Sequence, residues 1–427
     1  MPAPRVLVLV ENLSVPFDRR VWQECRALTE AGYRVEVICP RGSGRDTEPF
    51  AEIDGVRIHR YPLTAATGGP AGYVREYGAA LWHTLRIARR LSREAPFDVV
   101  HACNPPDLLF LIALALRPTG ARFLFDHHDL VPELFESRFA GGPRALLGVS
   151  ELLERLTFWA SDAVISTNES YRQAAIGRGG LPADRVRVVR SAPDLSRFVP
   201  VAPDPELRHG KRFLACYLGV MGPQDGVDYA LRALASLRDE LGRDDVHATF
   251  IGSGDAFDES VVLAESLGLA GMVEFTGRVP DETVQAYLST ADVCLSPDPR
   301  NPLNDVSSMN KVVEYMAMGR PLVSFELHEA RVTAQDAAVY APANDERRFA
   351  ELIAELLDDP ERRERMGAIG RRRVQEALSW DVSRSNLLAA YEDLLGRPLR
   401  RRERRRLNGP RRLPMRLRRR SAVGEAR

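Results

Sequence analysis

The sequence feature that most constrains the fold is a series of short apolar runs, each followed by an amphipathic stretch. Residues 6–10 read Val-Leu-Val-Leu-Val, residues 18–31 carry apolar side chains at helical spacing, and residues 34–39 form a second run. An unbroken apolar run is typical of a strand that is covered on both faces. Strand, helix and strand within about 35 residues form a βαβ unit with parallel strands and a right-handed crossover. The pattern therefore predicts an α/β fold.

The runs fall into two series, before and after a stretch rich in proline and aspartate at residues 191–212. A chain of 427 residues is too long for one core, so we predict two Rossmann-like domains. Their strand C-termini would face a central cleft, where such folds bind ligands. The predicted parts are a first domain at 1–190, a linker at 191–212, a second domain at 213–378, a final helix at 379–396 and a basic, disordered tail at 397–427.

Apolar and cysteine content exclude two classes of protein. No window reaches the roughly 18 uninterrupted apolar residues of a membrane span. The five cysteines stand singly among apolar residues, as reduced core residues do, which argues against a disulfide scaffold. Residues 1–5 lead directly into the first strand, so we expect no signal peptide and a cytoplasmic protein.

The net charge of zero hides an asymmetry between the tail and the rest of the chain. Residues 397–427 hold 14 arginines and two glutamates but no aromatic residue that could stack on a base. An anionic membrane surface is therefore a better partner for the tail than nucleic acid, and a solubilising extension fits equally well. The helix expected at 73–94 has a basic face that suits either lipid or solvent.

The segment 304–323 is the most informative about function. Its pattern predicts a loop, a helix that ends at Gly319, and a strand. Lys311 and Glu314 share one helix face, and only Lys211 and Lys311 are lysines among the 59 basic residues. A flexible ammonium suits a phosphate. Ser307, Ser308 and Asn310 lie at the helix start, where free N–H groups attract anions. The alternative is a serine cap with a surface ion pair.

A second polar group follows the strand at 122–126. It begins His127-His128-Asp129 and ends at Glu133. These side chains could transfer a proton or contact a sugar hydroxyl or a phosphate, or they could cap a helix. No partner with metal-ligand spacing is present, so we expect no metal.

A glycine-rich turn follows the first strand of the second domain. Gly219 and Gly222 lie where phosphates meet backbone N–H groups, although glycine can also serve tight geometry alone. The turn is not G-x-G-x-x-G, so a dinucleotide fingerprint is not supported. G-x-S-x-G, Walker and isolated D-x-D motifs are absent as well.

With these motifs, residues 5–395 resemble the retaining nucleotide-sugar glycosyltransferases of family 4, which have the GT-B fold. The matching phrases lie at 12–22, 126–129, 250–254, 275–279 and 314–321, and the last is the most specific. The resemblance implies an acceptor-side first domain, a nucleotide-sugar second domain and a C-terminal helix that crosses back onto the first. It also implies that Glu314 binds the ribose and that His128 lies near the donor sugar and its phosphates.

Three positions depart from the family pattern: Val306 replaces a glutamate, Val220 an arginine and Asp225 a lysine. The two basic residues normally neutralise the leaving pyrophosphate. Our hypothesis is that Lys311 and the helix start, with Arg20 or Arg278, hold the phosphates instead. Asp305 would replace the missing acid.

These expectations describe an enzyme that transfers a hexose from a nucleotide-diphospho-sugar with retention and without a metal or other cofactor. The acceptor would be a cell-envelope glycan or a lipid-linked saccharide. The alternatives are a non-catalytic GT-B binding protein and a nucleotide-sugar 2-epimerase. The expected catalytic residues are His128, Asp129 and Lys311; the donor-binding residues are Glu314, Asp305, Ser307, Ser308, Asn310, Gly219, Gly222 and Arg278; the acceptor-side residues are Arg20 and Glu133.

Overall fold

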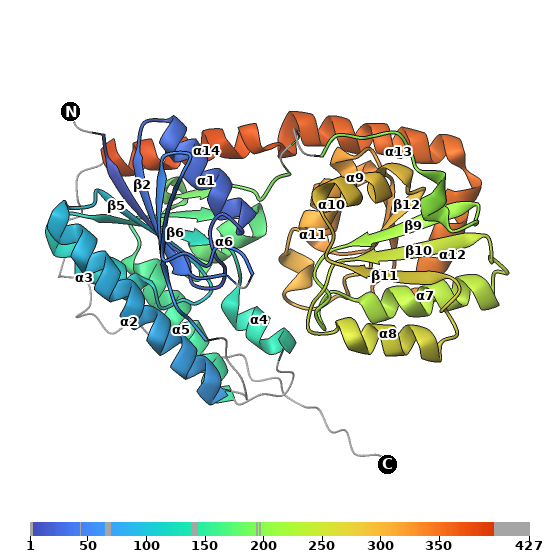
Figure 1. Cartoon of the computed structure of the whole chain (residues 1–427), viewed down its shortest axis with the longest axis horizontal. Helices are drawn as coiled ribbons and strands as arrows, with labels where there is room; N and C mark the ends of the chain where they lie inside the picture. The colour runs from blue at the N-terminus through green and yellow to red at the C-terminus, as the bar shows by residue number, and fades with distance from the viewer. Residues whose placement is uncertain are drawn as a thin grey trace, which may run out of the picture.

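The computed structural model arranges the chain as two α/β domains side by side (Figure 1). It describes residues 3–42, 44–64, 70–138, 144–193, 195 and 198–396. The tail expected at 397–427 lies outside these residues. Among the described helices, none combines the length and the apolar content that a membrane crossing requires.

The first domain is built on an eight-stranded sheet with the order β3-β4-β2-β1-β5-β6-β7-β8. Its strands are β1 (Arg5–Leu9), β2 (Arg34–Pro40), β3 (Phe50–Ile53), β4 (Val56–Tyr61), β5 (Val99–Cys103), β6 (Arg122–His127), β7 (Ala163–Ser166) and β8 (Val186–Val188). All neighbours are parallel except β3 and β4, an antiparallel pair at one edge. The residues of β1 are all buried, as the apolar run predicts.

The edge pair β3–β4 has no counterpart in the sequence analysis. Side chains in β3 alternate between exposed and half-buried, so that strand carries no continuous apolar run.

Six α-helices belong to the described part of the first domain. They are α1 (Arg19–Glu30), α2 (Pro70–Glu94), α3 (Phe110–Leu116), α4 (Val131–Arg138), α5 (Arg144–Ala160) and α6 (Glu169–Gly177). Helix α1 begins where the carboxylate of Asp18 accepts the N–H of Val21 at 3.1 Å, which caps the helix. Figure 1 shows α2, α3 and α5 together on one side of this domain.

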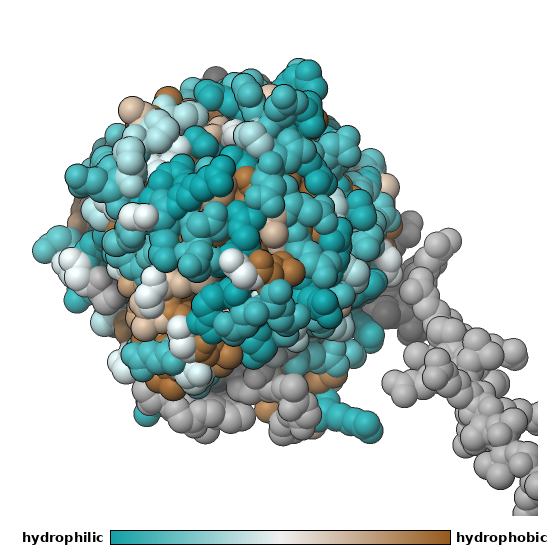
Figure 2. Space-filling view, turned by 90° about the vertical axis from the view of Figure 1, so that its right-hand side faces the viewer, coloured by the Kyte–Doolittle hydropathy of each residue, from teal (hydrophilic) through white to brown (hydrophobic). Residues whose placement is uncertain are grey.

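The second domain is built on a six-stranded parallel sheet with the order β11-β10-β9-β12-β13-β14. Its strands are β9 (Phe213–Leu218), β10 (Val246–Ile251), β11 (Val273–Gly277), β12 (Val293–Ser296), β13 (Leu322–Phe325) and β14 (Ala338–Ala341). The helices that follow β9 are α7 (Val227–Asp239), α8 (Phe257–Ser266), α9 (Asp281–Thr290), α10 (Asn310–Ala317), α11 (His328–Ala334), α12 (Glu346–Asp358), α13 (Pro360–Arg373) and α14 (Trp380–Gly396). Figure 2 views the molecule from this domain's end, which is largely hydrophilic with small apolar patches.

Helix α14 runs back from the second domain to the first (Figure 1). Its Tyr391 is fully buried in the first domain's core, and the hydroxyl lies 2.8 Å from Nδ1 of His101. The side chain of Asn386 donates to the carbonyl oxygen of Val188 at 2.9 Å. These contacts confirm the predicted crossing helix.

Candidate active site

The two domains enclose a cavity of about 1360 Å³. His128 and Asp129 line it directly after β6, and Leu218 and Gly219 line it at the end of β9. The cavity therefore lies where strand C-termini of both sheets face each other, which is the arrangement that the two-domain prediction requires.

His128 is held by a buried carboxylate. Its Nε2 lies 2.5 Å from Oδ2 of Asp126, and Nη2 of Arg20 donates to Oδ1 of Asp126 at 2.7 Å. Although burial opposes ionisation, Arg20 and His128 hold the pKa of Asp126 well below its usual range. Nε of Arg20 also lies 2.8 Å from Nε2 of His128. Nε2 of His128 cannot both donate to Asp126 and accept from Arg20. The contact with the carboxylate is the shorter of the two, so we place a hydrogen on Nε2 and let it donate to Asp126.

Arg20 lies beneath the cavity rather than on its wall. It is 8% exposed, and its guanidinium also donates to the carbonyl oxygen of Val189 at 2.8 Å. A second carboxylate oxygen, on Glu24, lies 3.2 Å from Nη2. The structure differs here from the expected acceptor-side or phosphate contact, because the buried carboxylate of Asp126 requires this cation. Arg20 positions Asp126, which positions His128.

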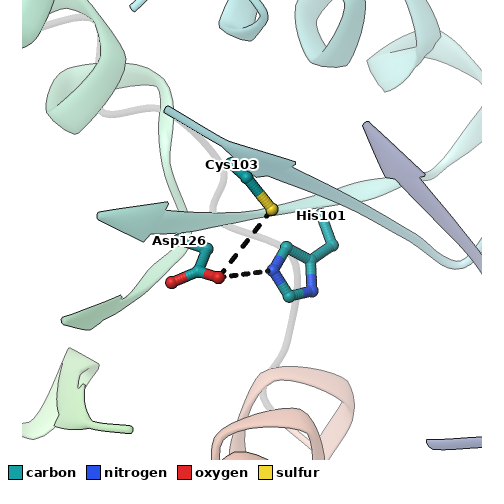
Figure 3. Close-up of side chains that lie close together, drawn as sticks. All are labelled: His101, Cys103 and Asp126. Carbon is teal, nitrogen blue, oxygen red and sulfur yellow. Dashed lines mark hydrogen bonds and ion pairs between the residues drawn. The ribbon is translucent and has the colours of Figure 1, made fainter. Parts of the chain in front are cut away.

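Figure 3 shows three neighbours that resemble a set of metal ligands: His101 and Cys103 from β5 and Asp126 from β6. Oδ2 of Asp126 lies 3.4 Å from Nε2 of His101 and 3.8 Å from Sγ of Cys103. Arg20 already neutralises this carboxylate, and burial raises the pKa of the Cys103 thiol well above its usual value. A cation bound here would need the Cys103 thiol as a thiolate and would lie beside the positive guanidinium of Arg20, so these residues fit a metal site poorly.

Asn104 fixes the loop that carries His128 and Asp129. Its Oδ1 accepts their N–H groups at 2.7 and 3.1 Å, and its Nδ2 donates to the carbonyl oxygen of Asp129 at 2.7 Å. Asn104 is not among the predicted site residues, although its place directly after β5 marks it as a candidate.

Asp107 is a further acid on the cavity wall that the sequence analysis missed. It is 3% exposed, and Oδ1 accepts a hydrogen bond from Asn104 at 3.1 Å, whereas Oδ2 has no hydrogen-bond partner among the described residues. Burial first, and then the charge of Glu154, raise the pKa of Asp107 to about 8. Asp107 is therefore largely protonated at neutral pH.

On the opposite wall, two glycine turns approach each other closely. A Cβ on Gly252 would lie 1.9 Å from the carbonyl oxygen of Gly219, and φ of Gly252 is +134°. Only glycine fits there. Gly219 lines the cavity, whereas the N–H of Gly222 is bonded within the turn to Asp225 at 2.9 Å and Gly222 is not on the wall.

Lys311 lies on the cavity wall in an ion pair. Its Nζ donates to Oδ1 of Asp298 at 2.6 Å and lies 4.8 Å from the ring centre of Tyr217. The side chain is 6% exposed. Burial disfavours the charge, but Asp298 holds the pKa of Lys311 above its usual value. The ammonium is therefore charged, and its field in the cavity is largely compensated.

Glu314 and the start of α10 also line the cavity. Glu314 is half-buried, burial raises its pKa, and its carboxylate has no hydrogen-bond partner among the described residues. Asn310 is the exposed first residue of α10. Ser308 Oγ donates to Glu329 at 3.2 Å, and Ser307 Oγ lies 2.8 Å from the hydroxyl of Tyr171. The free carboxylate makes Glu314 the site's most available acceptor.

Three predicted residues lie elsewhere. Oδ1 of Asp305 accepts the N–H of His328 at 3.0 Å, so this acid caps α11 instead of reaching the cavity. Arg278 is exposed, with its guanidinium carbon 5.1 Å from the ring centre of Phe17. Glu133 forms an ion pair with Arg178.

Arg190, which the sequence analysis missed, is the second strong cation on the described part of the wall. Its Nη1 donates to Oγ of Ser308 at 3.4 Å, and the described residues offer it no carboxylate at ion-pair distance. Burial lowers its pKa, although an arginine still remains charged at neutral pH. Arg190 lies two residues after β8, the last strand of the first domain's sheet.

The cavity extends from these polar groups into an apolar groove on the first domain, between α2, α4 and α5. The groove is lined by Tyr73, Val74, Tyr77, Leu81, Leu134, Phe135, Leu146, Val149 and Leu153. Polar and apolar ends of one cavity suit a ligand with both characters.

Comparison with protein families decides the assignment. A profile described as "Glycosyl transferase 4-like domain" matches residues 18–192, and one described as "Glycosyl transferases group 1" matches residues 212–359. The chain belongs to glycosyltransferase family 4. This glycosyltransferase has the GT-B fold that the resemblance predicted, with the profile boundary falling in the expected linker.

Its relatives act on different molecules. The GDP-mannose-dependent alpha-(1-6)-phosphatidylinositol monomannoside mannosyltransferase of Mycobacterium tuberculosis is 27% identical over 85% of this chain and 90% of its own. The alpha-D-kanosaminyltransferase of Streptomyces kanamyceticus is 27% identical over 81% of this chain and 88% of its own. Sucrose-phosphate synthase from Thermosynechococcus elongatus superposes with a TM-score of 0.76 at 19% identity, over 92% of this chain and 99% of that one.

Proposed function

We propose that this glycosyltransferase transfers a hexose from a nucleotide-diphospho-sugar to a lipid-linked saccharide, with retention of the anomeric configuration. The observation that carries the proposal is one cavity with an unpaired Glu314 on the second domain and the held His128 on the first. A related enzyme is named as GDP-mannose-dependent, which supports a nucleotide-sugar donor.

The donor would bind against the second domain. The carboxylate of Glu314 accepts hydrogen bonds from the ribose hydroxyls, and Gly219 lets the backbone approach the ligand closely. Arg190, Lys311 and the N–H groups at the start of α10 face the diphosphate. These groups would take the role of a metal ion, so we propose a reaction that requires none.

The acceptor would bind against the first domain, near His128, Asp129 and Asp107. Its hydroxyl oxygen bonds to the anomeric carbon while the bond from that carbon to the phosphate oxygen breaks, and the nucleoside diphosphate keeps the electron pair. The hydroxyl proton moves to the leaving phosphate oxygen. The acceptor-side groups orient the hydroxyl for this step.

The apolar groove supports the lipid part of the acceptor. Exposed apolar side chains continue from it over α2 and α5, namely Val74, Trp82, Val149, Leu152 and Trp159. Exposed arginines accompany them on α2, namely Arg75, Arg86, Arg89, Arg90 and Arg93. Apolar and basic residues on one surface suit an anionic membrane. We propose a peripheral enzyme on the cytoplasmic face of a membrane, in keeping with its free buried cysteines.

The experiment incubates the enzyme with a panel of UDP- and GDP-hexoses, with and without EDTA and with and without a membrane-lipid extract. The proposal predicts nucleoside diphosphate release that depends on the extract, with a glycolipid product whose anomeric configuration matches the donor's by NMR. An epimerised donor would instead support the 2-epimerase, and binding without turnover the non-catalytic protein. Turnover abolished by EDTA in protein that keeps its melting temperature would overturn the metal-independent reaction.

A further inference from the structure

Two histidines and a glutamate lie close together at the N-terminal ends of the strands of the second sheet, away from the cavity. His247 is the second residue of β10 and Glu274 the second residue of β11, and His209 lies four residues before β9 begins. The cavity lies beyond the opposite ends of these parallel strands, where Gly219 follows β9. Six strand residues span roughly 20 Å, so this cluster is separate from the active site.

The spacing of the three donor atoms resembles that of a metal site. Nε2 of His209 lies 3.3 Å from Oε2 of Glu274, and Nε2 of His247 lies 3.8 Å from the same oxygen. All three donor atoms lie within 4.8 Å of one another. Two ligands bound tetrahedrally to zinc at 2.0–2.2 Å are about 3.4 Å apart. The pair of His209 and Glu274 already has that spacing, and the side chain of His247 would need to rotate to reach it.

His247 supplies an independent reason to expect a ligand there. It is 5% exposed, and neither ring nitrogen has a hydrogen-bond partner among the described residues. A buried polar group without a partner destabilises a fold, so such a group needs explanation. A metal ion bound to Nε2 would satisfy that nitrogen. The hydroxyl of Tyr287 donates to Oε2 of Glu274 at 3.1 Å and would orient the carboxylate, as second-sphere groups do.

We propose that His209, His247 and Glu274 bind a divalent transition-metal ion, with zinc as the first candidate. Imidazole and carboxylate ligands suit zinc, whereas magnesium and calcium prefer oxygen alone. The side chain of His209 is 48% exposed, so the ion can enter from solvent and keep water as its fourth ligand. Because His209 belongs to the chain that leads from the linker into β9, the ion clamps that end of the linker to β10 and β11.

The experiment titrates zinc into metal-free, full-length protein by calorimetry and repeats the titration with cobalt to record its visible absorption. Wild-type protein is expected to bind about one zinc ion and to give the intense cobalt bands of a four-coordinate site. His209→Ala and Glu274→Gln are expected to weaken zinc binding at least about tenfold. Both positions are partly exposed, so these variants should fold.

Two matched variants locate the ion. His328→Ala, at an exposed histidine on α11, and Cys103→Ser, at the buried group of Figure 3, should leave zinc affinity unchanged. Zinc should raise the melting temperature of wild type but not of His209→Ala. Wild-type protein that binds no zinc, or equal affinity in wild type and His209→Ala, would overturn the proposal. So would loss of binding in Cys103→Ser.

Discussion

The ammonium of Lys311 and the carboxylate of Asp298 form a buried ion pair, 2.6 Å apart, on the wall of the interdomain cavity. This chain lacks two cations of the family pattern, because Val220 and Asp225 stand at their positions. Lys311 is present where a replacement would be useful, yet Asp298 compensates its charge. The ion pair gives Lys311 a structural role. The phosphate contact is a second role that we propose for it, and variants can separate the two.

Lys311→Ala is expected to reduce sugar transfer more than about tenfold, or 1.4 kcal/mol of barrier. It also leaves Asp298 buried without its cation, which should cost roughly 3–5 kcal/mol of stability. The double variant Lys311→Met with Asp298→Asn should recover most of the stability without recovering transfer. The measurements are melting temperature and kcat/KM, with Lys211→Ala as the control. A double variant as active as wild type would remove Lys311 from the donor site.

Arg190→Gln is expected to weaken nucleoside diphosphate binding by about tenfold, because this guanidinium has no carboxylate partner among the described residues. Salt should weaken binding less steeply in the variant than in wild type. Isothermal titration at two salt concentrations measures both effects. Arg278→Ala, which changes an exposed arginine away from the wall, is the control. Equal affinities for Arg190→Gln and Arg278→Ala would contradict the assignment.

Asp107 should make the stability of the folded protein depend on pH between pH 4 and pH 8. Its pKa is about 8 in the folded protein and about 4 in an unfolded chain. The folded state then binds the proton more tightly, so this stabilisation is complete below pH 4 and is lost as pH rises towards 8. Asp107→Asn should therefore gain melting temperature relative to wild type between pH 5 and pH 8. A difference that stays constant across this range would show that Asp107 is ionised throughout.

Tyr391 joins the crossing helix to the group that holds His128, through His101 and Asp126. Tyr391→Phe removes one hydrogen bond and should cost about 1 kcal/mol of stability. If the contact also positions His128, kcat should fall at least about threefold while the donor KM stays constant. Tyr33→Phe changes the ring that packs against Tyr391 and is the control. An unchanged kcat would limit Tyr391 to a structural role.

The parts of the fold and of the site that depend on local sequence pattern could be predicted from apolar runs and from the residues that follow them. Apolar runs such as that of β1 identify buried parallel strands, and residues directly after such strands, including His128 and Gly219, do line the cavity. The helix predicted to end at Gly319 has Lys311 and Glu314 on one face, and both residues do line the same wall of the cavity.

Other residues depend on tertiary contacts that no local pattern contains. Asp305 neighbours the site in sequence, but its carboxylate caps α11, 23 residues later. Arg20 lies in a motif that resembles the family, yet its partner Asp126 is 106 residues away and buried. Asp298, which determines the state of Lys311, lies two residues after β12, but no local pattern pairs it with Lys311.

The central claim is that the interdomain cavity binds a nucleoside diphosphate through Glu314. Titration calorimetry with UDP and with GDP tests it most directly, on wild type, Glu314→Gln and the off-site control Asp305→Asn. The account predicts that wild type and Asp305→Asn bind at least one of the two nucleotides with similar affinity, and that Glu314→Gln binds it at least about tenfold more weakly. Absence of binding by both nucleotides, or equal affinity in wild type and Glu314→Gln, would contradict it.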